Sequence, residues 1–288
     1  MSLINYNLFG KIDKVQMAID RLRTFEPEEG YIIADSGGKD STCIVALAEM
    51  AGVKHECVYN VTTVDPPELV RFLREKRPNT RFQMAHDKNG EPITMWNLIP
   101  RKGMPPTRLI RYCCQYLKES NGKGRIVVTG VRWAESSNRK NNQGTVTIIS
   151  KGADKIPEVQ AANFTSTVRG GVVLNDENKE SRRAVEICYR TKRTLVNPII
   201  DWTDEDVWEF IRTYNLPYCE LYDCGHKRLG CIGCPMGGRK GMLQEFEQYP
   251  KYKALYLKAF DRMIVENKRI GRRNDKDTAE EWFDWWVQ

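Results

Sequence analysis

Short apolar runs alternate with longer amphipathic stretches along the first half of the chain. Apolar side chains recur at helical spacing over residues 11–25, and the run Tyr-Ile-Ile-Ala at 31–34 is typical of a buried parallel strand. The same periodicities predict a helix over 42–50 and a strand over 55–60. They also predict a helix over 67–76 and a further strand over 125–130. This alternation predicts an α/β fold with a Rossmann-like parallel sheet and helices on both faces.

The remaining pattern suggests how the chain divides into domains. We expect residues 1–215 to form one α/β domain, in which the polar and poorly periodic stretch 140–185 is an inserted loop or hairpin. A helix begins after residue 201, where Thr203 or Asp204 supplies the N-cap and acidic residues occupy the first turn. Residues 216–288 would then form a Cys-rich segment with C-terminal helices that are charged and rich in tryptophan.

The loop after the first predicted strand carries the strongest chemical signal. It consists of small, polar and charged residues: Ser36-Gly37-Gly38-Lys39-Asp40-Ser41. Two glycines let the backbone approach a phosphate, and the helix that follows points free N–H groups at the anion. The serines add hydroxyl donors, the lysine adds a charge, and Asp40 orients Mg²⁺ or caps the helix. The loop therefore predicts a nucleotide phosphate site, with a spacing unlike that of Walker-type NTPases.

A second strand end lies near this loop in the predicted sheet. Residues 129–132, Thr-Gly-Val-Arg, follow the strand at 125–130. Ligands of parallel sheets bind at the carboxyl ends of the strands, so Gly130 and Arg132 become candidate ligand-binding residues. The planar guanidinium fork of arginine suits phosphate or sulfate oxygens.

Composition narrows the partners. The chain of 288 residues is 41% hydrophobic and 29% charged, and it contains no apolar run long enough to span a membrane. We expect a cytoplasmic protein with no membrane partner. The net charge of +7 favours nucleotides, sulfated compounds or nucleic acid as partners, or reflects a mildly basic surface without a specific one.

Nine cysteines add a second chemistry. Disulfides are not expected in a reducing cytosol, so clustered cysteines suggest metal or redox chemistry. Cys224, Cys231 and Cys234 are separated by six and then two residues, and the pair Cys113-Cys114 lies upstream. Thiolates at such spacings hold zinc or an iron–sulfur cluster. The isolated cysteines are expected to be buried free thiols: Cys43, Cys57 and Cys188.

The glycine loop resembles the PP-loop of the adenine nucleotide alpha hydrolase superfamily, whose members cleave ATP between its α and β phosphates or bind related sulfonucleotides. Over roughly residues 25–240 the chain resembles the phosphoadenosine phosphosulfate (PAPS) reductase family. Four further segments carry this resemblance: Val64-Asp65-Pro66-Pro67-Glu68, Arg111-Tyr112-Cys113-Cys114 through Lys118, Thr129-Gly130-Val131-Arg132 through Glu135-Ser136 and Arg139, and Asn197-Pro198 through Asp201-Trp202. The resemblance implies ATP or PAPS as the ligand, with Mg²⁺, and an arginine facing the nucleotide, here Arg132 and also Arg139.

The resemblance leaves two cysteine sets open. Adenosine phosphosulfate reductases bind a four-iron four-sulfur (4Fe–4S) cluster through a Cys-Cys pair and a later Cys-x-x-Cys, which correspond to Cys113, Cys114, Cys231 and Cys234. The DNA phosphorothioation sulfurtransferase implies Cys224, Cys231 and Cys234, with Cys219 or Cys114 as the fourth ligand. We take Cys114, Cys224, Cys231 and Cys234 as the expected ligands of a 4Fe–4S cluster, with Cys113 as the alternative residue and zinc as the alternative metal.

One feature of the reductases is missing. Their nucleophilic cysteine lies near the C-terminus in a Glu-Cys-Gly-Leu-His context, and no cysteine follows Cys234 here. We therefore expect an ATP-dependent, adenylating iron–sulfur sulfurtransferase with Lys39, Asp40 and Arg132 in catalysis. Its acceptor would be a nucleic acid, and its sulfur donor a protein such as a cysteine desulfurase. The alternatives are a PAPS or adenosine phosphosulfate reductase, and a non-catalytic nucleotide- or nucleic-acid-binding subunit, which exposed C-terminal tryptophans would favour.

Overall fold

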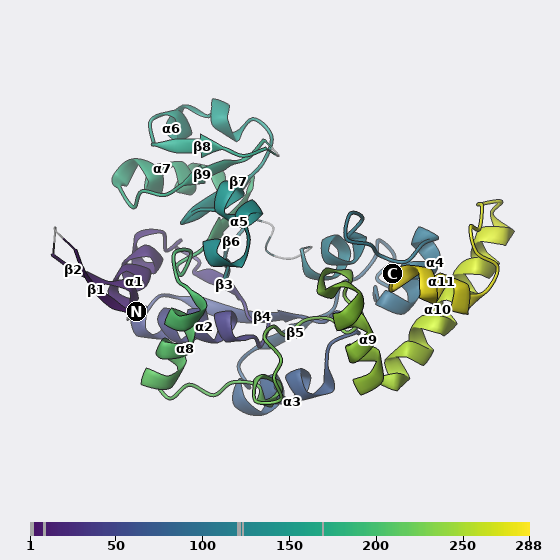
Figure 1. Cartoon of the computed structure of the whole chain (residues 1–288). Helices are drawn as coiled ribbons and strands as arrows, with labels where there is room; N and C mark the ends of the chain where they lie inside the picture. Colours follow the sequence, from purple (N-terminus) through teal and green to yellow (C-terminus); the bar gives the residue numbers. More distant parts are fainter. Residues whose placement is uncertain (1–2, 8–9, 120–121, 123, 169) are drawn as a thin grey trace. The chain divides into compact units, whose positions relative to one another are not determined.

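The computed structural model describes residues 3–7, 10–119, 122, 124–168 and 170–288 (Figure 1). It divides into two compact units. The first contains Met1–Tyr59, Phe72–Arg81 and Gly122–Gly225, and the second contains Asn60–Arg71, Phe82–Asn121 and His226–Gln288. The units therefore do not follow the sequence boundary at 215/216 that the pattern suggested. Residues 82–121 group with the C-terminal helices because their helix α4 (Met95–Lys102) packs against α10 (Pro250–Arg269).

The first unit holds most of the strands. An antiparallel pair, β1 (Ile4–Asn7) and β2 (Gly10–Asp13), precedes the main sheet. The other strands of the first unit are β3 (Tyr31–Ala34), β4 (His55–Asn60), β6 (Ile126–Val128), β7 (Val146–Ile149), β8 (Phe164–Ser166), β9 (Val172–Leu174) and β10 (Arg193–Val196). Its α-helices are α1 (Lys14–Thr24), α2 (Lys39–Ala51), α5 (Ser137–Asn142), α6 (Pro157–Gln160), α7 (Lys179–Cys188) and α8 (Asp204–Thr213). Three elements cross the sequence boundaries of the units: β4, by its last residue, α3 (Pro67–Lys76) and β5 (Arg81–Gln83).

The main sheet is mainly parallel at its centre and antiparallel on one side. Its strand order is β5-β4-β3-β6-β10-β7-β9-β8. The ladders β3–β4, β3–β6 and β6–β10 are parallel, as predicted. The ladders β10–β7, β7–β9 and β8–β9 are antiparallel, so the predicted parallel sheet is confirmed for its central strands and continues as antiparallel strands on one side. The stretch 140–185 extends the sheet because its short apolar runs, such as Val172–Leu174, are buried.

Alternation along the central strands creates two apolar faces. Ile33 of β3, Val128 of β6 and Val196 of β10 belong to the large core that also contains apolar residues of α1, α2 and α8. Ile32 and Val127, one position away in the same strands, belong to a smaller cluster. Successive side chains of a strand point to opposite faces, so these strands are buried on both sides. That burial explains their continuous apolar runs in the sequence.

The second unit is helical and aromatic. It contains α4, the π-helical segment η1 (Cys114–Lys118), α9 (Gly238–Gln248), α10 and α11 (Ala279–Trp286). The rings of Phe246, Tyr256 and Trp286 pack on one another, and Trp286 Nε1 donates to the carbonyl of Pro106 at 2.6 Å. Trp282 and Trp286 are buried, while Trp285 is 40% exposed. The tryptophans of the tail therefore serve mainly as core residues.

No helix within the described ranges is both long and apolar enough to cross a membrane.

Alanine substitutions at two glycines of the first unit would measure how tightly the chain packs around each position. Gly30 and Gly52 both have a positive φ, but an added Cβ at Gly30 would lie 2.6 Å from the carbonyl oxygen of Lys54, whereas none of the described atoms lies within 4 Å at Gly52. Left-handed backbone alone costs an alanine about 1–2 kcal/mol. We expect Gly52→Ala to lower the free energy of unfolding by that amount, and Gly30→Ala by roughly 3–5 kcal/mol because it adds a steric clash. Urea unfolding measures both, and equal losses would contradict the packing around Gly30.

Candidate functional site

The glycine loop lies where strand β3 passes into helix α2. Gly37 has a φ of +72°, a left-handed conformation that favours glycine. Gly38 is the N-cap of α2 in extended conformation and supplies no side-chain cap. The hydroxyls of Ser41 and Thr42 both donate to the carbonyl of Gly38, at 2.9 and 3.0 Å. These two hydroxyls therefore bond to a carbonyl at the start of α2, and no side chain of the N-cap accepts from the first N–H groups of the helix.

The side chain of Asp35 fixes the glycine loop through hydrogen bonds. Its carboxylate is buried and accepts from Arg77 Nη1 at 2.6 Å, from Thr80 Oγ1 at 2.9 Å and from the backbone N–H of Gly37 at 3.1 Å. Arg77 Nη2 also donates to Thr42 Oγ1 at 2.5 Å. The strand end, the loop and the start of α2 are therefore fixed together by one buried ion pair.

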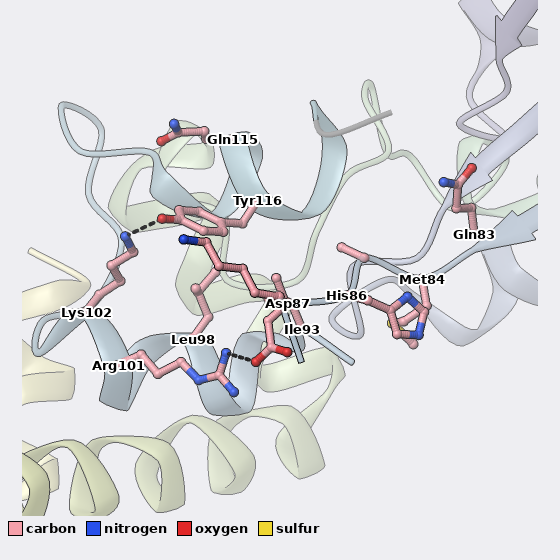
Figure 2. A pocket seen from close by; sticks show the side chains of 12 residues that line it. Gln83, Met84, His86, Asp87, Ile93, Leu98, Arg101, Lys102, Gln115 and Tyr116 are labelled. Atoms are coloured by element: carbon pink, nitrogen blue, oxygen red, sulfur yellow. Dashed lines mark hydrogen bonds and ion pairs between the residues drawn. The ribbon is translucent and has the colours of Figure 1, made fainter. Parts of the chain in front are cut away.

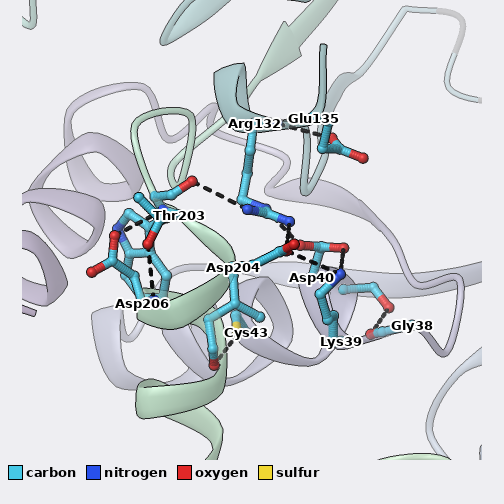
Figure 3. Close-up of polar contacts among 12 residues, drawn as sticks. Gly38, Lys39, Asp40, Cys43, Arg132, Glu135, Thr203, Asp204 and Asp206 are labelled. Atoms are coloured by element: carbon cyan, nitrogen blue, oxygen red, sulfur yellow. Dashed lines mark hydrogen bonds and ion pairs between the residues drawn. The ribbon is translucent and has the colours of Figure 1, made fainter. Parts of the chain in front are cut away.

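Four charged side chains meet at the mouth of the loop (Figure 3). Arg132 Nε donates to Asp40 Oδ1 at 2.7 Å, and its Nη2 donates to Asp204 Oδ1 at 2.6 Å. Lys39 Nζ lies 3.3 Å from Asp204 Oδ1 and 3.7 Å from Asp40 Oδ2. Lys39 and Arg132 are only 4% and 2% exposed. We call Lys39, Asp40, Arg132 and Asp204 the charge quartet; it brings together all three residues that the sequence predicted as catalytic.

The quartet shifts the ionisation of two of its members. Partial burial acts to raise the pKa of Asp204, but the hydrogen bond from Arg132 and the charge of Lys39 outweigh it, so this pKa lies below its usual value. Burial likewise acts to lower the pKa of Arg132, and Asp40 and Asp204 reverse that effect, so its pKa is raised. Asp204 and Arg132 are therefore both charged near neutral pH.

The neighbouring candidates occupy different environments. An added Cβ at Gly130 would lie 2.9 Å from Asp40 Cβ, so this glycine allows the end of β6 to approach the first turn of α2. Arg139 forms an ion pair with Glu135 one helical turn away. Ser36 Oγ donates to Ser41 Oγ at 3.3 Å, which places both predicted hydroxyl donors side by side.

Tyr222 supplies the cap that α2 lacks. Its hydroxyl accepts from the backbone N–H of Lys39 at 2.8 Å, and it comes from the short 3₁₀ turn Glu220–Tyr222. The Tyr222 ring packs against Trp208 with centroids 5.2 Å apart. The first N–H group of the helix, which the sequence assigned to a phosphate, is thus occupied by a phenol oxygen.

The second unit contains a cavity of about 40 Å³ that is lined by four cysteines, namely Cys113, Cys114, Cys231 and Cys234. Lys118, Thr62 and Tyr256 also line it. Cys231 Sγ donates to Thr62 Oγ1 at 3.5 Å. Cys224 is exposed and Cys219 is buried, and both belong to the first unit. Of the two cysteine sets, the structure gathers the one that contains the adjacent pair.

The turn between Cys231 and Cys234 is held by a hydrogen bond from its backbone to the side chain of Glu245. Glu245 accepts from the N–H of Gly233 at 2.7 Å, and burial raises the pKa of this carboxyl to about 7. Gly233 has a φ of +71°, and an added Cβ would lie 2.6 Å from the ring of Phe246. The Cys-x-x-Cys turn is therefore confined to one conformation.

The thiols of the cavity differ in acidity. A hydrogen bond from Cys113 lowers the pKa of Cys114, with the charges of Lys118 and Arg111 adding to the effect, while the same bond and burial raise the pKa of Cys113. Burial raises the pKa of Cys231, and when this thiol is ionised its negative charge raises the pKa of Lys118. Cys114 is therefore the member of the pair that ionises first.

Within the ranges that the structure describes, no three His, Cys, Asp or Glu side chains are grouped to hold a single metal ion. Each cysteine of a four-iron cluster binds a different iron, so four thiols around one cavity suit such a cluster without meeting at one point. The remaining cysteines, Cys43, Cys57 and Cys188, lie outside the cavity, and burial raises the pKa of each. His226 is exposed and hydrogen-bonds to Gln248.

Sequence reasoning missed several residues of the site. The sequence offers Thr203 or Asp204 as the N-cap of helix α8; Thr203 is the N-cap, and Asp204 joins the quartet. A single sequence carries no local signal for Tyr222 or for the partnership of Asp35 with Arg77. The one usable clue was the position of Asp35 between a buried strand and the glycine loop.

Comparison with known proteins agrees with the family suggested by the motifs. Residues 30–236 match the phosphoadenosine phosphosulfate reductase domain. The adenosine 5'-phosphosulfate reductase of Staphylococcus epidermidis is 40% identical over 218 residues, which cover 72% of this chain and 71% of that protein. An uncharacterized protein of Methanocaldococcus jannaschii is 26% identical over 250 residues, covering 84% of this chain but only 48% of the relative. This chain thus spans about half the length of that relative.

Among solved structures, the PAPS reductase of Candida auris in its phosphate complex aligns with a TM-score of 0.41 at 15% identity, covering 74% of this chain and 87% of that one. The match over residues 30–236 confirms the resemblance inferred from the glycine loop and its four companion segments. The chain belongs to the phosphoadenosine phosphosulfate reductase domain family.

Proposed function

We propose that this protein binds ATP at the glycine loop and adenylates an oxygen of a nucleic acid, which then exchanges that oxygen for sulfur. The observation that carries the proposal is the charge quartet at the N-terminus of α2, where two buried cations and two carboxylates surround the loop. Cations at such a position stabilise charge that develops on phosphate oxygens. The carboxylates have the oxygen chemistry that Mg²⁺ prefers.

The reaction divides into two balanced steps. An acceptor oxygen forms a bond to the α phosphorus of ATP while the bond from that phosphorus to the bridging oxygen breaks, and pyrophosphate leaves. Hydrosulfide then forms a carbon–sulfur bond and AMP leaves with the acceptor oxygen. Lys39 and Arg132 would hold the phosphates in line and stabilise the leaving pyrophosphate. Asp40 and Asp204 would hold Mg²⁺, which neutralises charge on the phosphates when bound.

The four cysteines of the cavity would hold a 4Fe–4S cluster. The donor set fits this group, because Cys113, Cys114, Cys231 and Cys234 supply four thiols around one largely apolar cavity. A bound cluster would supply sulfur-binding or electron-transfer chemistry. The confined Cys-x-x-Cys turn and the lowered pKa of Cys114 favour thiolate ligands.

A sulfonucleotide reductase is the second candidate function. The name of the Staphylococcus epidermidis relative supports it, since that protein is called an adenosine 5'-phosphosulfate reductase. Such a reductase needs a thiolate outside the cluster that attacks sulfur. Cys43 and Cys188 are buried. Cys224 is the exposed thiol among the described residues, which makes it the residue to test.

Replacing the loop lysine should weaken nucleotide binding. A charge-assisted phosphate contact contributes about 1.5–3 kcal/mol, so we expect Lys39→Ala to raise the Kd for Mg-ATP by roughly ten- to a hundredfold. Isothermal titration calorimetry measures the change. Lys54→Ala is the matched control, because Lys54 is an exposed lysine of the same unit that lies outside the loop. Equal affinity of the two variants would show that the loop is not the nucleotide site.

The cysteine set can be decided by iron analysis of anaerobically purified protein. We expect Cys113→Ala and Cys231→Ala to lose iron and acid-labile sulfide, and to unfold at lower temperature because metal binding is coupled to folding. Cys224→Ala should keep both, since this residue belongs to the other unit. Loss of iron in Cys224→Ala with retention in Cys113→Ala would select the other set. One zinc per chain without iron would refute the cluster.

Product analysis separates the two functions. We expect ATP to release pyrophosphate slowly and a nucleic acid to accelerate that release in the presence of sulfide. We expect no sulfite from PAPS or adenosine phosphosulfate with thioredoxin. Rapid sulfite formation by the iron-loaded protein, lost in Cys224→Ala, would establish the reductase instead.

A further inference from the structure

A pocket of about 730 Å³ lies within the second unit, beside its cysteine cavity (Figure 2). Three stretches of chain form its walls: residues 83–88, helix α4 and the π-helical segment η1. Its apolar part consists of Met84, Ala85, Ile93 and Leu98. The other eight of the twelve residues that line it are polar or charged. The pocket is therefore largely polar, and its size lies within the range of ligand sites.

The charged side chains of the pocket leave an excess of positive charge. The one carboxylate, Asp87, is already bound to Arg101 at 3.0 Å and accepts from the N–H groups of Asn89 and Glu91. Lys88 and Lys102 also line the pocket, and neither forms an ion pair within the part of the chain that the structure describes. The two lysines are therefore available to an anion.

One of these lysines is held in position. Lys102 Nζ donates to Tyr116 Oη at 3.0 Å and lies 4.3 Å from the centroid of the Tyr116 ring (Figure 2). A cation that is fixed by an aromatic ring and a hydroxyl loses little side-chain entropy when it binds a phosphate. Gln83 and Gln115 line the same pocket and carry both donors and acceptors.

The pocket shares a wall with the cysteine cavity. Within the segment 113–118, Cys113, Cys114, Leu117 and Lys118 line the cavity, while Gln115 and Tyr116 line the pocket. A ligand bound against Tyr116 therefore touches the same turn of π-helix that carries Cys114. π-Helical turns occur frequently at functional sites.

We propose that this pocket binds a single-stranded nucleic acid, which is the acceptor of the proposed function. Lys88 and Lys102 match its phosphates, the amide of Gln115 matches the edge of a base, and the apolar residues of the pocket match the faces of the bases. Lys88, His86 and Arg101 are exposed, so the strand can continue beyond the pocket.

Strand binding can be measured directly by fluorescence anisotropy with labelled single-stranded oligonucleotides of RNA and of DNA. We expect binding to the whole chain, with Lys88→Ala and Lys102→Ala each lowering affinity about fivefold near 0.1 M salt and reducing the salt slope by about 0.7, the effect of one lost phosphate contact. Lys258→Ala is the matched control, because this exposed lysine lies on α10 of the same unit and does not line the pocket. Excess ATP should not displace the strand, because the loop is a different site.

Unchanged affinity and salt slope in both pocket variants would overturn the proposal, as would equal loss in Lys258→Ala or displacement of the strand by ATP. Polyglutamate that binds as tightly, with the same dependence on Lys88, would also overturn it by showing a general polyanion site. The role of acceptor rests on the proposed function, whereas strand binding is measured without ATP. Strand binding without any acceleration of pyrophosphate release would therefore refute the proposed function and leave the pocket assignment in place.

Discussion

The charge quartet is the interaction on which the rest of the nucleotide site depends. It joins the first turn of α2, the end of β6 and the first turn of α8, three segments that are far apart in the sequence. Lys39 and Arg132 are buried, so removing the carboxylates that face them would leave buried positive charge uncompensated. The elements that surround the loop are therefore held in register by the same side chains that are available to phosphate.

The two chemistries of the chain reside in different units. The charge quartet lies in the first unit, and the four-cysteine cavity lies in the second. Each unit is assembled from separate stretches of chain, and the second needs residues 82–121 and 226–288 to pair before its aromatic core exists. Such non-local contacts form late in folding because loop closure must precede them. The two cysteine pairs that line the cavity, Cys113 with Cys114 and Cys231 with Cys234, accordingly lie more than a hundred residues apart in the sequence.

The sequence predicted those parts of the fold that depend on local pattern. The strands at 31–34 and 55–60 and the helix at 67–76 are confirmed, because continuous burial or amphipathic spacing is visible within a few residues. The antiparallel strands β7 and β9 are too short, and too surrounded by polar residues, to be recognised. The site divides in the same way: Lys39 follows from its loop, whereas Asp204 and Tyr222 reach it only through tertiary contacts. Cysteine spacing alone could not choose between the two ligand sets. It does not show which of the later cysteines lie beside Cys113 and Cys114 in the folded chain.

The phenol of Tyr222 gives the nucleotide site an occupant of its own. A phosphate that binds the Lys39 amide must replace an existing hydrogen bond, so the measured affinity is a difference between two bonded states and understates the strength of the phosphate contact. Because the Tyr222 ring rests edge-on against Trp208, the exchange also disturbs an indole. Trp208 therefore contacts the residue that a phosphate at the Lys39 amide would displace, and its fluorescence is expected to change when a nucleotide binds there.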